Sequence, residues 1–184
     1  IDYEAPLHWR HNRDLSGYNI MQMGIWYETL LRWIGPASSV NAITAVNVKT
    51  RQDEANNTHI ISIPDHVEVL CETISGPMVH MSFSTVTGFK SPDQVWLFGT
   101  NGTLKLDVST MTLFGGQRND SDLSEIKIPK NKEGKWRVEE EFVNAIRGLE
   151  SITHTSFEDG VKYMEFSEAV TRSAQSGTKI SLPI

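Results

Sequence analysis

The chain has 184 residues, of which 39% are hydrophobic and 22% are charged, and its formal net charge is −6. These totals fit one ordinary domain with a sizeable core, and the lack of a basic block in the sequence argues against nucleic-acid or anionic-membrane binding. The single cysteine, Cys71, excludes an internal disulfide framework and favours a reducing compartment. Since the sequence also shows no signal peptide and no apolar run of roughly 20 residues, we expect a cytoplasmic protein.

Residues 1–16 are polar and irregular, and they bring basic and aromatic side chains together. The members of this group are His8, Trp9, Arg10, His11 and Arg13. One interpretation is an anion-binding lip for a phosphate or a carboxylate. The other is a solvated segment that leads into the next helix.

A helix is predicted between the Ser16-Gly17 break and Gly35-Pro36, because these pairs are typical helix ends. Apolar residues recur within it at steps of three and four, the spacing of one helical face. They are Ile20, Met23, Tyr27, Leu30, Leu31 and Ile34.

A neighbouring stripe of the same helix carries polar and aromatic groups. It contains Gln22, Trp26 and Thr29, with Asn19 one turn earlier. The stripe either contacts a ligand, through the Trp26 ring and the Gln22 amide, or is a packed indole with an amide at its edge. Asn19 also suits a helix N-cap. Glu28 is either an acid/base group or the partner of Arg32 at i+4.

Several strands are predicted after this helix, in residues 40–50, in a hairpin over 67–86, in a second hairpin over 95–108, at 111–114 and at 126–128. Residues 51–63 are predicted to be a loop. Asn101-Gly102 lies in the second hairpin, and such a pair predicts a turn in which both central residues have positive φ.

Helices are predicted at 136–149 and from Ser156 to Gly177, and a strand is predicted at 179–182. Strands that cluster between helices, instead of alternating with them, indicate an α+β fold. We therefore predict an open, mostly antiparallel β-sheet with helices packed on one face. No group of His, Cys, Asp and Glu has the spacing of metal ligands, so no metal site is expected.

These patterns together resemble the C-terminal domain of the Gfo/Idh/MocA family, the relatives of glucose-fructose oxidoreductase and inositol dehydrogenase. The family typically carries Trp-Arg, a glycine-rich turn, Asp-x-Gly-x-His-x-x-Asp and a glycine. The matching positions here are Trp9-Arg10, Ser16-Gly17, Gln22-x-Gly24-x-Trp26-x-x-Thr29 and Gly35. Two further points of resemblance are the hairpin Gly99-Thr100-x-Gly102 and the final helix, Gly177 and strand.

The resemblance implies that residues 1–184 are a single C-terminal α+β domain and that an N-terminal dinucleotide-binding domain lies outside this chain. The whole protein would be an NAD(P)-dependent oxidoreductase of a sugar, polyol or related hydroxy compound, with NAD or NADP held by the other domain. This chain would supply the substrate-cleft wall through Arg10, Asn19, Gln22 and Trp26, with no cofactor-binding residue of its own. It would form a homo-oligomer through the open sheet face, and it would be inactive in isolation.

Gln22 and Trp26 stand where the family carries Asp and His, and neither can act as a general acid or base near neutral pH. No catalytic residue is therefore assigned. The departure leaves two alternatives open: a non-catalytic relative that binds a ligand or acts as a regulator, and a stand-alone dimerisation module.

Overall fold

The computed structural model describes residues 5–18, 20, 22–89, 92–153 and 156–184. The chain divides into two compact units, which we call the first unit (Ile1–Thr87 and Glu150–Ile184) and the second unit (Gly88–Leu149). All strand pairs of the described residues are antiparallel, and helices accompany the sheets, which confirms the predicted α+β class.

The first unit is built on a four-stranded sheet with the order β10-β1-β4-β5. Its strands are β1 (Ala37–Ala45), β4 (His66–Thr73), β5 (Met78–Ser84) and β10 (Ile180–Ser181). Val69 lies opposite both Ala42 and Met81 in the register. Because side chains alternate between the two faces of a strand, these three share one face, and all three are buried.

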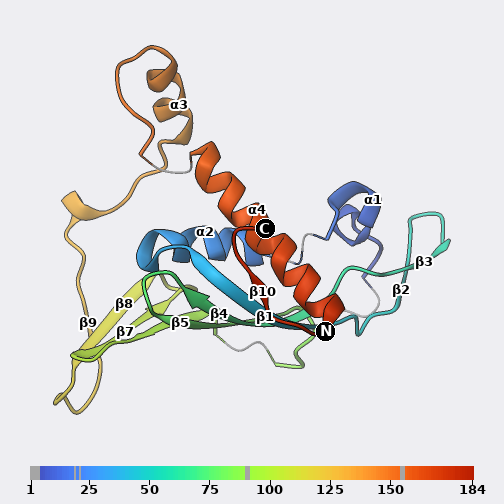
Figure 1. Ribbon diagram of the computed structural model, residues 1–184, viewed down its shortest axis with the longest axis horizontal. Coiled ribbons are helices and arrows are strands. Elements are labelled where there is room, and N and C mark those ends of the chain that lie inside the picture. Colours follow the sequence, from blue (N-terminus) through green and yellow to red (C-terminus); the bar gives the residue numbers. More distant parts are fainter. Residues whose placement is uncertain (1–4, 19, 21, 90–91, 154–155) are drawn as a thin grey trace. The chain divides into compact units, whose positions relative to one another are not determined.

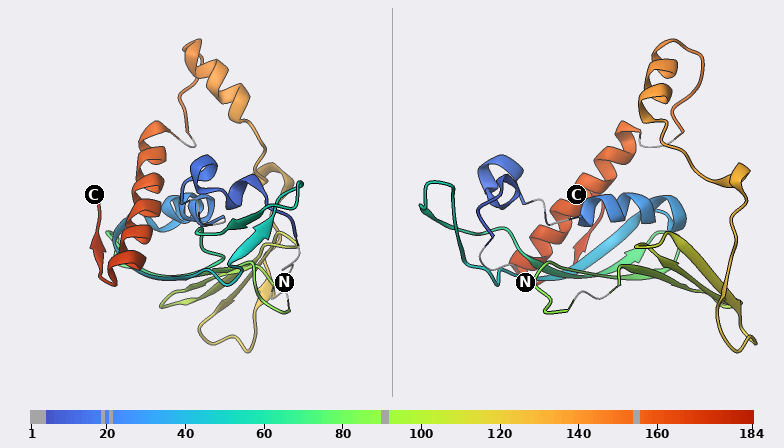
Figure 2. Two further views of the ribbon diagram at one scale, coloured as in Figure 1. Left: turned by 90° about the vertical axis from the view of Figure 1, so that its right-hand side faces the viewer. Right: turned by 180° about the vertical axis from the view of Figure 1, so that it is seen from behind.

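Two helices cover that face, α2 (Met23–Ile34) and α4 (Phe157–Ser176) (Figures 1 and 2). The most deeply buried side chains lie between these layers, among them Val67, Phe166 and Val170 at 0% exposure. The prediction of helices on one face of the sheet is confirmed. No helix over the described residues combines the length and the apolarity needed to cross a membrane.

The ends of α4 follow from its sequence. The Ser156 hydroxyl accepts a hydrogen bond from the Asp159 backbone N–H at 3.1 Å, which caps the first turn as predicted. At the other end Gly177 takes φ +67° and donates its N–H to the Ser173 carbonyl oxygen. A residue with a Cβ is strained in this left-handed conformation, so glycine suits the helix end.

The opposite face of this sheet is open to solvent. It carries apolar side chains at Ile43 (73% exposed), Leu70 (63%) and Met78 (85%). Between them lie Glu68 and Glu72, whose carboxylates are bonded to neighbouring side chains.

A short hairpin of β2 (Thr50–Gln52) and β3 (Thr58–Ile60) lies mostly in the stretch 51–63 that was predicted to be a loop, and this prediction was wrong for five residues. The Asp53 carboxylate organises its turn by accepting the backbone N–H groups of Ala55 and Asn57. Asn56 takes φ 62°, which Asn tolerates better than most residues. Strands of three residues carry too little alternation to be recognised from sequence.

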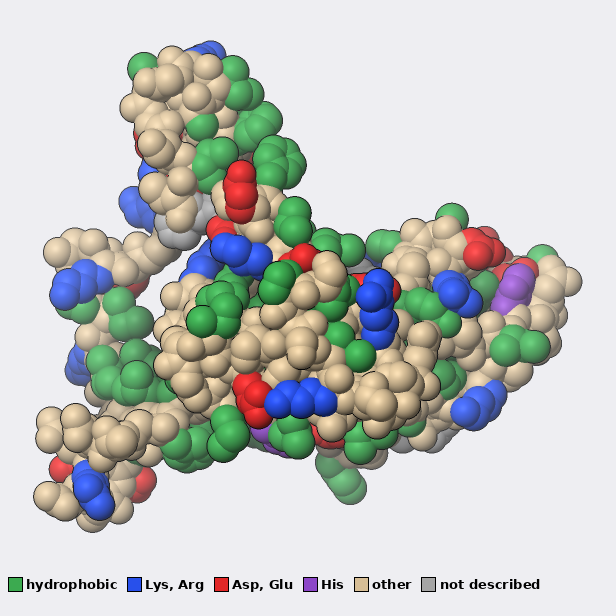
Figure 3. Space-filling model, in the orientation of Figure 1, with side chains coloured by type: hydrophobic (Ala, Val, Ile, Leu, Met, Phe, Trp, Pro, Cys, Tyr) green, Lys and Arg blue, Asp and Glu red, His purple; other side chains and the backbone are tan. Residues whose placement is uncertain are grey.

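The second unit contains a sheet with the order β6-β7-β8-β9. Its elements are β6 (Gln94–Phe98), β7 (Gly102–Asp107), β8 (Thr112–Gln117), β9 (Ser124–Glu125), the 3₁₀ turn η2 (Lys130–Lys132) and α3 (Val138–Ile146). The strand predicted at 126–128 therefore begins two residues earlier, as β9, and the helix predicted at 136–149 is shorter. Hydrophobic side chains reach the surface of α3 (Figure 3), for example Phe142 at 53% exposure and Ile146 at 72%.

Glycine has a different role in the β6–β7 hairpin from the one predicted. Neither Asn101 nor Gly102 has a positive φ, so the expected turn type is wrong. A Cβ on Gly102 would lie 2.3 Å from the Gly116 carbonyl oxygen. Gly102 is thus required by close approach of β7 to β8 and not by the turn conformation.

Candidate functional site

The polar stripe of α2 is the candidate site, and the helix begins later than predicted. A four-residue helix, α1 (Arg13–Ser16), ends at Gly17 with φ +61°, and α2 starts only at Met23. α1 lies within residues 1–16, so the prediction that this segment is irregular was wrong for these four residues. α2 itself begins six residues after Gly17, where the helix was predicted to start.

The buried face of α2 agrees with the predicted periodicity. Met23, Tyr27, Leu30 and Leu31 are all at or below 8% exposure, and Ile20 just before the helix is at 2%. This apolar face fixes the rotation of α2 on the sheet. It thereby determines which side chains are left on the outer side.

Gln22 occupies the N-cap position of α2, and its exposed side chain makes no capping hydrogen bond. Trp26 follows one turn later, half-buried, and its backbone N–H donates to the Gln22 backbone carbonyl oxygen at 3.1 Å. The amide and the indole therefore stand one turn apart on the outer side of the helix. Trp26 is therefore not fully buried in the core, as the packed-indole alternative required.

The remaining polar groups of α2 are occupied within the helix. The Thr29 hydroxyl donates to the Ile25 carbonyl oxygen at 3.1 Å. Glu28 pairs with Arg32, as the i+4 alternative predicted. Glu28 is thus engaged in a surface ion pair.

Arg10 lies on a separate element, the 3₁₀ turn η1 (Trp9–His11). Its guanidinium carbon sits 4.3 Å from the centroid of the Trp9 ring, and the side chain is exposed. Among the described residues no hydrogen bond or ion pair joins Arg10 to Gln22 or Trp26. Asn19, the fourth predicted residue, lies outside the described residues, and Gln22 takes the N-cap position of α2.

A cluster on the open sheet face was not predicted as a unit. The Glu68 carboxylate accepts the Ser82 hydroxyl at 2.6 Å and lies 2.8 Å from His80 Nε2 and 3.3 Å from His66 Nε2. Burial raises the pKa of Glu68, but these partners together hold it below its usual range. The register of β4 and β5 brings Glu68 and His80 together.

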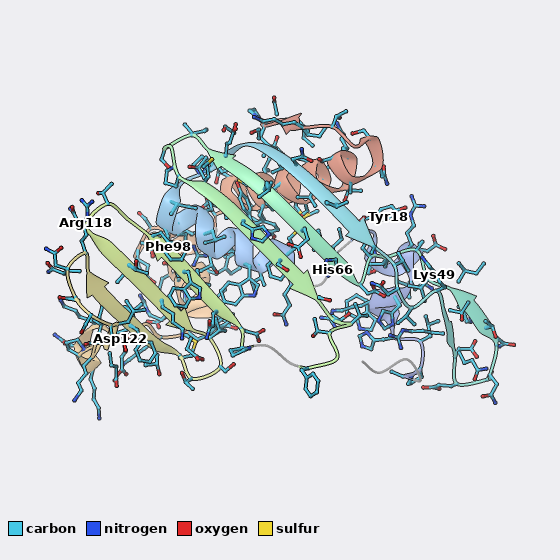
Figure 4. The ribbon with its side chains drawn as sticks, turned by 90° about the horizontal axis from the view of Figure 1, so that it is seen from below. Tyr18, Lys49, His66, Phe98, Arg118 and Asp122 are labelled. Carbon is cyan, nitrogen blue, oxygen red and sulfur yellow. The ribbon has the colours of Figure 1, made fainter. Side chains whose placement is uncertain are left out.

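The other reactive groups do not form a catalytic centre. Burial raises the pKa of the Cys71 thiol to about 11, which leaves it protonated and unreactive near neutral pH. No group of three or more His, Cys, Asp or Glu among the described residues is arranged to hold a metal ion. A shallow hollow in the second unit, beside Arg118 and Asp122, is lined by none of the four predicted residues (Figure 4).

Residues 2–105, more than half of the chain, match the family model described as the GFO/IDH/MocA C-terminal domain. No curated protein matches the sequence. Three solved structures with the same fold are a levoglucosan dehydrogenase in complex with NADH and L-sorbose, an oxidoreductase domain protein from Kribbella flavida, and the WlbA dehydrogenase from Bordetella pertussis in complex with NADH and UDP-GlcNAcA.

The match to the levoglucosan dehydrogenase has a TM-score of 0.82 and 18% sequence identity, and it covers 99% of this chain and 55% of that one. For the Kribbella flavida protein the TM-score is 0.80 and the sequence identity is 19%, and the match covers 100% of this chain and 56% of that one. For the Bordetella pertussis enzyme the TM-score is 0.62 and the sequence identity is 21%, and the match covers 89% of this chain and 44% of that one. The chain thus spans about half the length of the solved proteins that it matches.

Proposed function

Because the chain belongs to the family of Gfo/Idh/MocA C-terminal domains, we propose that it forms the substrate-binding half of an NAD(P)-dependent oxidoreductase. The observation that carries the proposal is the outer side of α2, where Gln22 presents an exposed amide that makes no capping hydrogen bond and Trp26 presents a half-buried ring one turn later. An indole stacks on the apolar face of a sugar ring, and an amide donates to or accepts from a hydroxyl. The substrate class that suits this pair is a sugar, a polyol or a related hydroxy compound.

The dinucleotide belongs to a second domain in this proposal. No described strand leads through a glycine-rich turn directly into a helix, which is the arrangement that binds a pyrophosphate. The residues described here therefore do not fit NAD or NADP by themselves. Residues 1–184 would act as a single C-terminal domain, and the isolated chain would be inactive.

The roles of the side chains follow from their chemistry. Trp26 would position the substrate ring and exclude water, and Gln22 would orient a hydroxyl. Arg10 would add a positively charged side chain to the wall of the cleft. None of these groups exchanges a proton near neutral pH, so they bind and orient the substrate.

Self-association through the open sheet face is part of the proposal. Ile43, Leu70 and Met78 leave apolar side chains exposed on that face, which is typical of a surface that another protein covers. The partner would be a second copy of the chain. Nucleic acid and membrane are not expected partners, and the cytoplasm is the expected compartment.

The test is a comparison of two tryptophans on one helix, made in the protein that also carries the dinucleotide-binding domain. Trp26→Ala should raise KM for a sugar or polyol substrate about tenfold or more, because the stacking surface is lost. The control is Trp33→Ala, since Trp33 lies near the other end of α2 and is 46% exposed. Equal effects of the two substitutions would contradict a substrate role for Trp26.

One observation favours a second function. With Gln22 and Trp26 at the positions where family members carry Asp and His, a non-catalytic ligand-binding or regulatory protein is the alternative. Saturable binding of a polyol without turnover of NAD or NADP would establish it. Dinucleotide reduction that depends on the polyol would exclude it.

A further inference from the structure

The N-terminal segment of the first unit carries a cluster of basic side chains that the proposed function uses only in part. Its members are His8, Arg10, His11 and Arg13, and Asp14 is the one acidic residue between positions 5 and 18. Basic side chains and a histidine are visible over α1, β2 and β3 in Figure 3. This concentration is unusual in a chain whose net charge is −6.

Both arginines are held by aromatic rings. The Arg10 guanidinium lies 4.3 Å from the centroid of the Trp9 ring, and the Arg13 guanidinium lies 4.4 Å from that of Tyr18. No described carboxylate forms an ion pair with either arginine. A guanidinium that stacks on a ring uses its flat face for the contact. Its N–H groups lie in the plane of the guanidinium and can still bind an oxyanion in bidentate fashion.

The two histidines are fixed by a reciprocal pair of hydrogen bonds around η1. The His8 Nδ1 atom accepts the Arg10 N–H at 3.3 Å, and the His11 Nδ1 atom accepts the His8 N–H at 3.2 Å. A nitrogen that accepts carries no proton, so the neutral form of each ring must be protonated at Nε2. Both imidazoles therefore offer an Nε2–H donor, for which no described residue is the acceptor.

Arg51 adds a further positive charge beside this cluster. Arg51 anchors the segment by donating to the Ala5 carbonyl oxygen at 2.7 Å, and Leu7 donates its N–H to the Gln52 carbonyl oxygen at 2.7 Å. Burial, and then the charges of Arg51 and His8, lower the pKa of His11, while Asp65 opposes them.

Asp65 is already engaged elsewhere. Its carboxylate accepts the backbone N–H groups of Asn47 and Val48 and the Asn47 side-chain amide, all within 2.9 Å. Tyr18 and Lys49 lie at the same end of the first unit (Figure 4). Asp65 is thus occupied by the β1–β2 connection.

We propose that His8, Arg10, His11 and Arg13 form a binding site for a small-molecule oxyanion, a phosphate or a carboxylate. The fork-shaped guanidinium groups would bind its oxygen atoms, and the two Nε2–H groups would donate to it. The inference goes beyond the proposed function, because it holds equally for a dehydrogenase and for a non-catalytic binding protein.

The experiment follows the imidazole resonances of His8 and His11 in this chain by NMR, during titration at constant ionic strength. The probes are inorganic phosphate, a hexose phosphate, a hexuronic acid and the neutral hexose. We expect saturable shifts with the anions and none with the neutral hexose. A response to inorganic phosphate alone would still support the site and identify free phosphate as its ligand.

The titration of His11 provides a second readout. A bound anion favours the protonated imidazole, so the pKa of His11 should rise when the site is filled. Arg51, His8 and Asp65 are the charged groups that act on this ring in the unliganded chain.

The paired substitution R10Q/R13Q should weaken anion binding about tenfold or more, because it removes two charge-assisted donors. The control is R172Q, which makes the same change at an exposed position of α4 and should alter affinity less than about twofold. An unchanged anion response in R10Q/R13Q, with its circular dichroism intact, would overturn the proposal. Equal losses in R10Q/R13Q and R172Q, or shifts with the neutral hexose, would do so as well.

Discussion

The ring of Tyr27 stacks on the ring of Phe166, with centroids 3.7 Å apart and planes inclined by 4°. The contact joins α2 to α4 above the sheet. The Tyr27 hydroxyl also accepts the backbone N–H of Ala37 at 2.9 Å, where β1 begins. One side chain therefore ties together both helices and the sheet on which the candidate site depends.

Tyr27→Phe keeps the stacked ring and removes only the hydroxyl. The buried N–H of Ala37 then loses its acceptor, so we expect the free energy of unfolding to fall by about 1–3 kcal/mol. Urea unfolding measures the change. Tyr18→Phe is the control, since Tyr18 makes no described hydrogen bond through its hydroxyl, and a loss of the same size there would refute the assignment.

Ser173 is a second buried polar link, at 0% exposure. Its hydroxyl accepts the Ala42 N–H at 2.9 Å and donates to the Thr178 carbonyl oxygen at 2.7 Å. Ser173→Ala leaves two backbone groups unpaired and should lower the free energy of unfolding by about 2 kcal/mol or more. Ser176→Ala, on an exposed position of the same helix, should change it by less than about 0.5 kcal/mol. If both variants unfold at the same urea concentration, the two bonds contribute nothing.

Much of the first unit could be predicted because its residues repeat with a clear period. Val67, Val69 and Cys71 alternate along a strand, and Met23 and Tyr27 recur along a helix. Burial against an opposing layer produces both periods, so the sequence carries them.

The features that were missed depend on distant partners or on short segments. α2 begins at Met23, six residues after the Ser16-Gly17 break from which the helix was predicted, because a break in the sequence does not by itself fix the first helical residue. The Glu68–His80 contact exists only because the register places Glu68 opposite Ser82 and Leu70 opposite His80. For the candidate site, helical periodicity placed Gln22 and Trp26 one turn apart, but no periodicity relates Arg10 to them.

Gly102 offers a test of packing in the second unit. A Cβ at this position would meet the Gly116 carbonyl oxygen at 2.3 Å and the Gln117 Cα atom at 3.1 Å, both of them backbone atoms. Gly102→Ala must push β7 away from β8, and we expect a destabilisation of about 1–3 kcal/mol. Hydrogen exchange of the β7 and β8 amides measures the local effect.

The matched control for this substitution is Gly134→Ala, because a Cβ at Gly134 has no atom within 4 Å. In Gly134→Ala, the amide exchange rates of β7 and β8 should equal those of the unaltered chain. Normal protection of both strands in Gly102→Ala would show that the two backbones can separate without penalty.

Asp65 gives the chain a predictable response to acid. Burial raises the pKa of its carboxyl, but the N–H groups of Val48 and Asn47 outweigh burial and hold it below the usual value of 3.8. A carboxylate with a lowered pKa in the folded state stabilises that state above the unfolded pKa, and this contribution disappears as the pH falls through the folded pKa. Asp65→Ala should therefore lower the free energy of unfolding by roughly 2 kcal/mol at neutral pH.

The difference between Asp65→Ala and the unaltered chain should stay constant above about pH 5 and shrink below it, as the carboxyl of the unaltered chain becomes protonated. Unfolding by urea at a series of pH values measures it. Glu54→Ala is the control, since the exposed Glu54 carboxylate makes no hydrogen bond with a described residue. A difference that persists unchanged down to about pH 2 would mean that packing, and not the charge of Asp65, stabilises the join between β1 and β2.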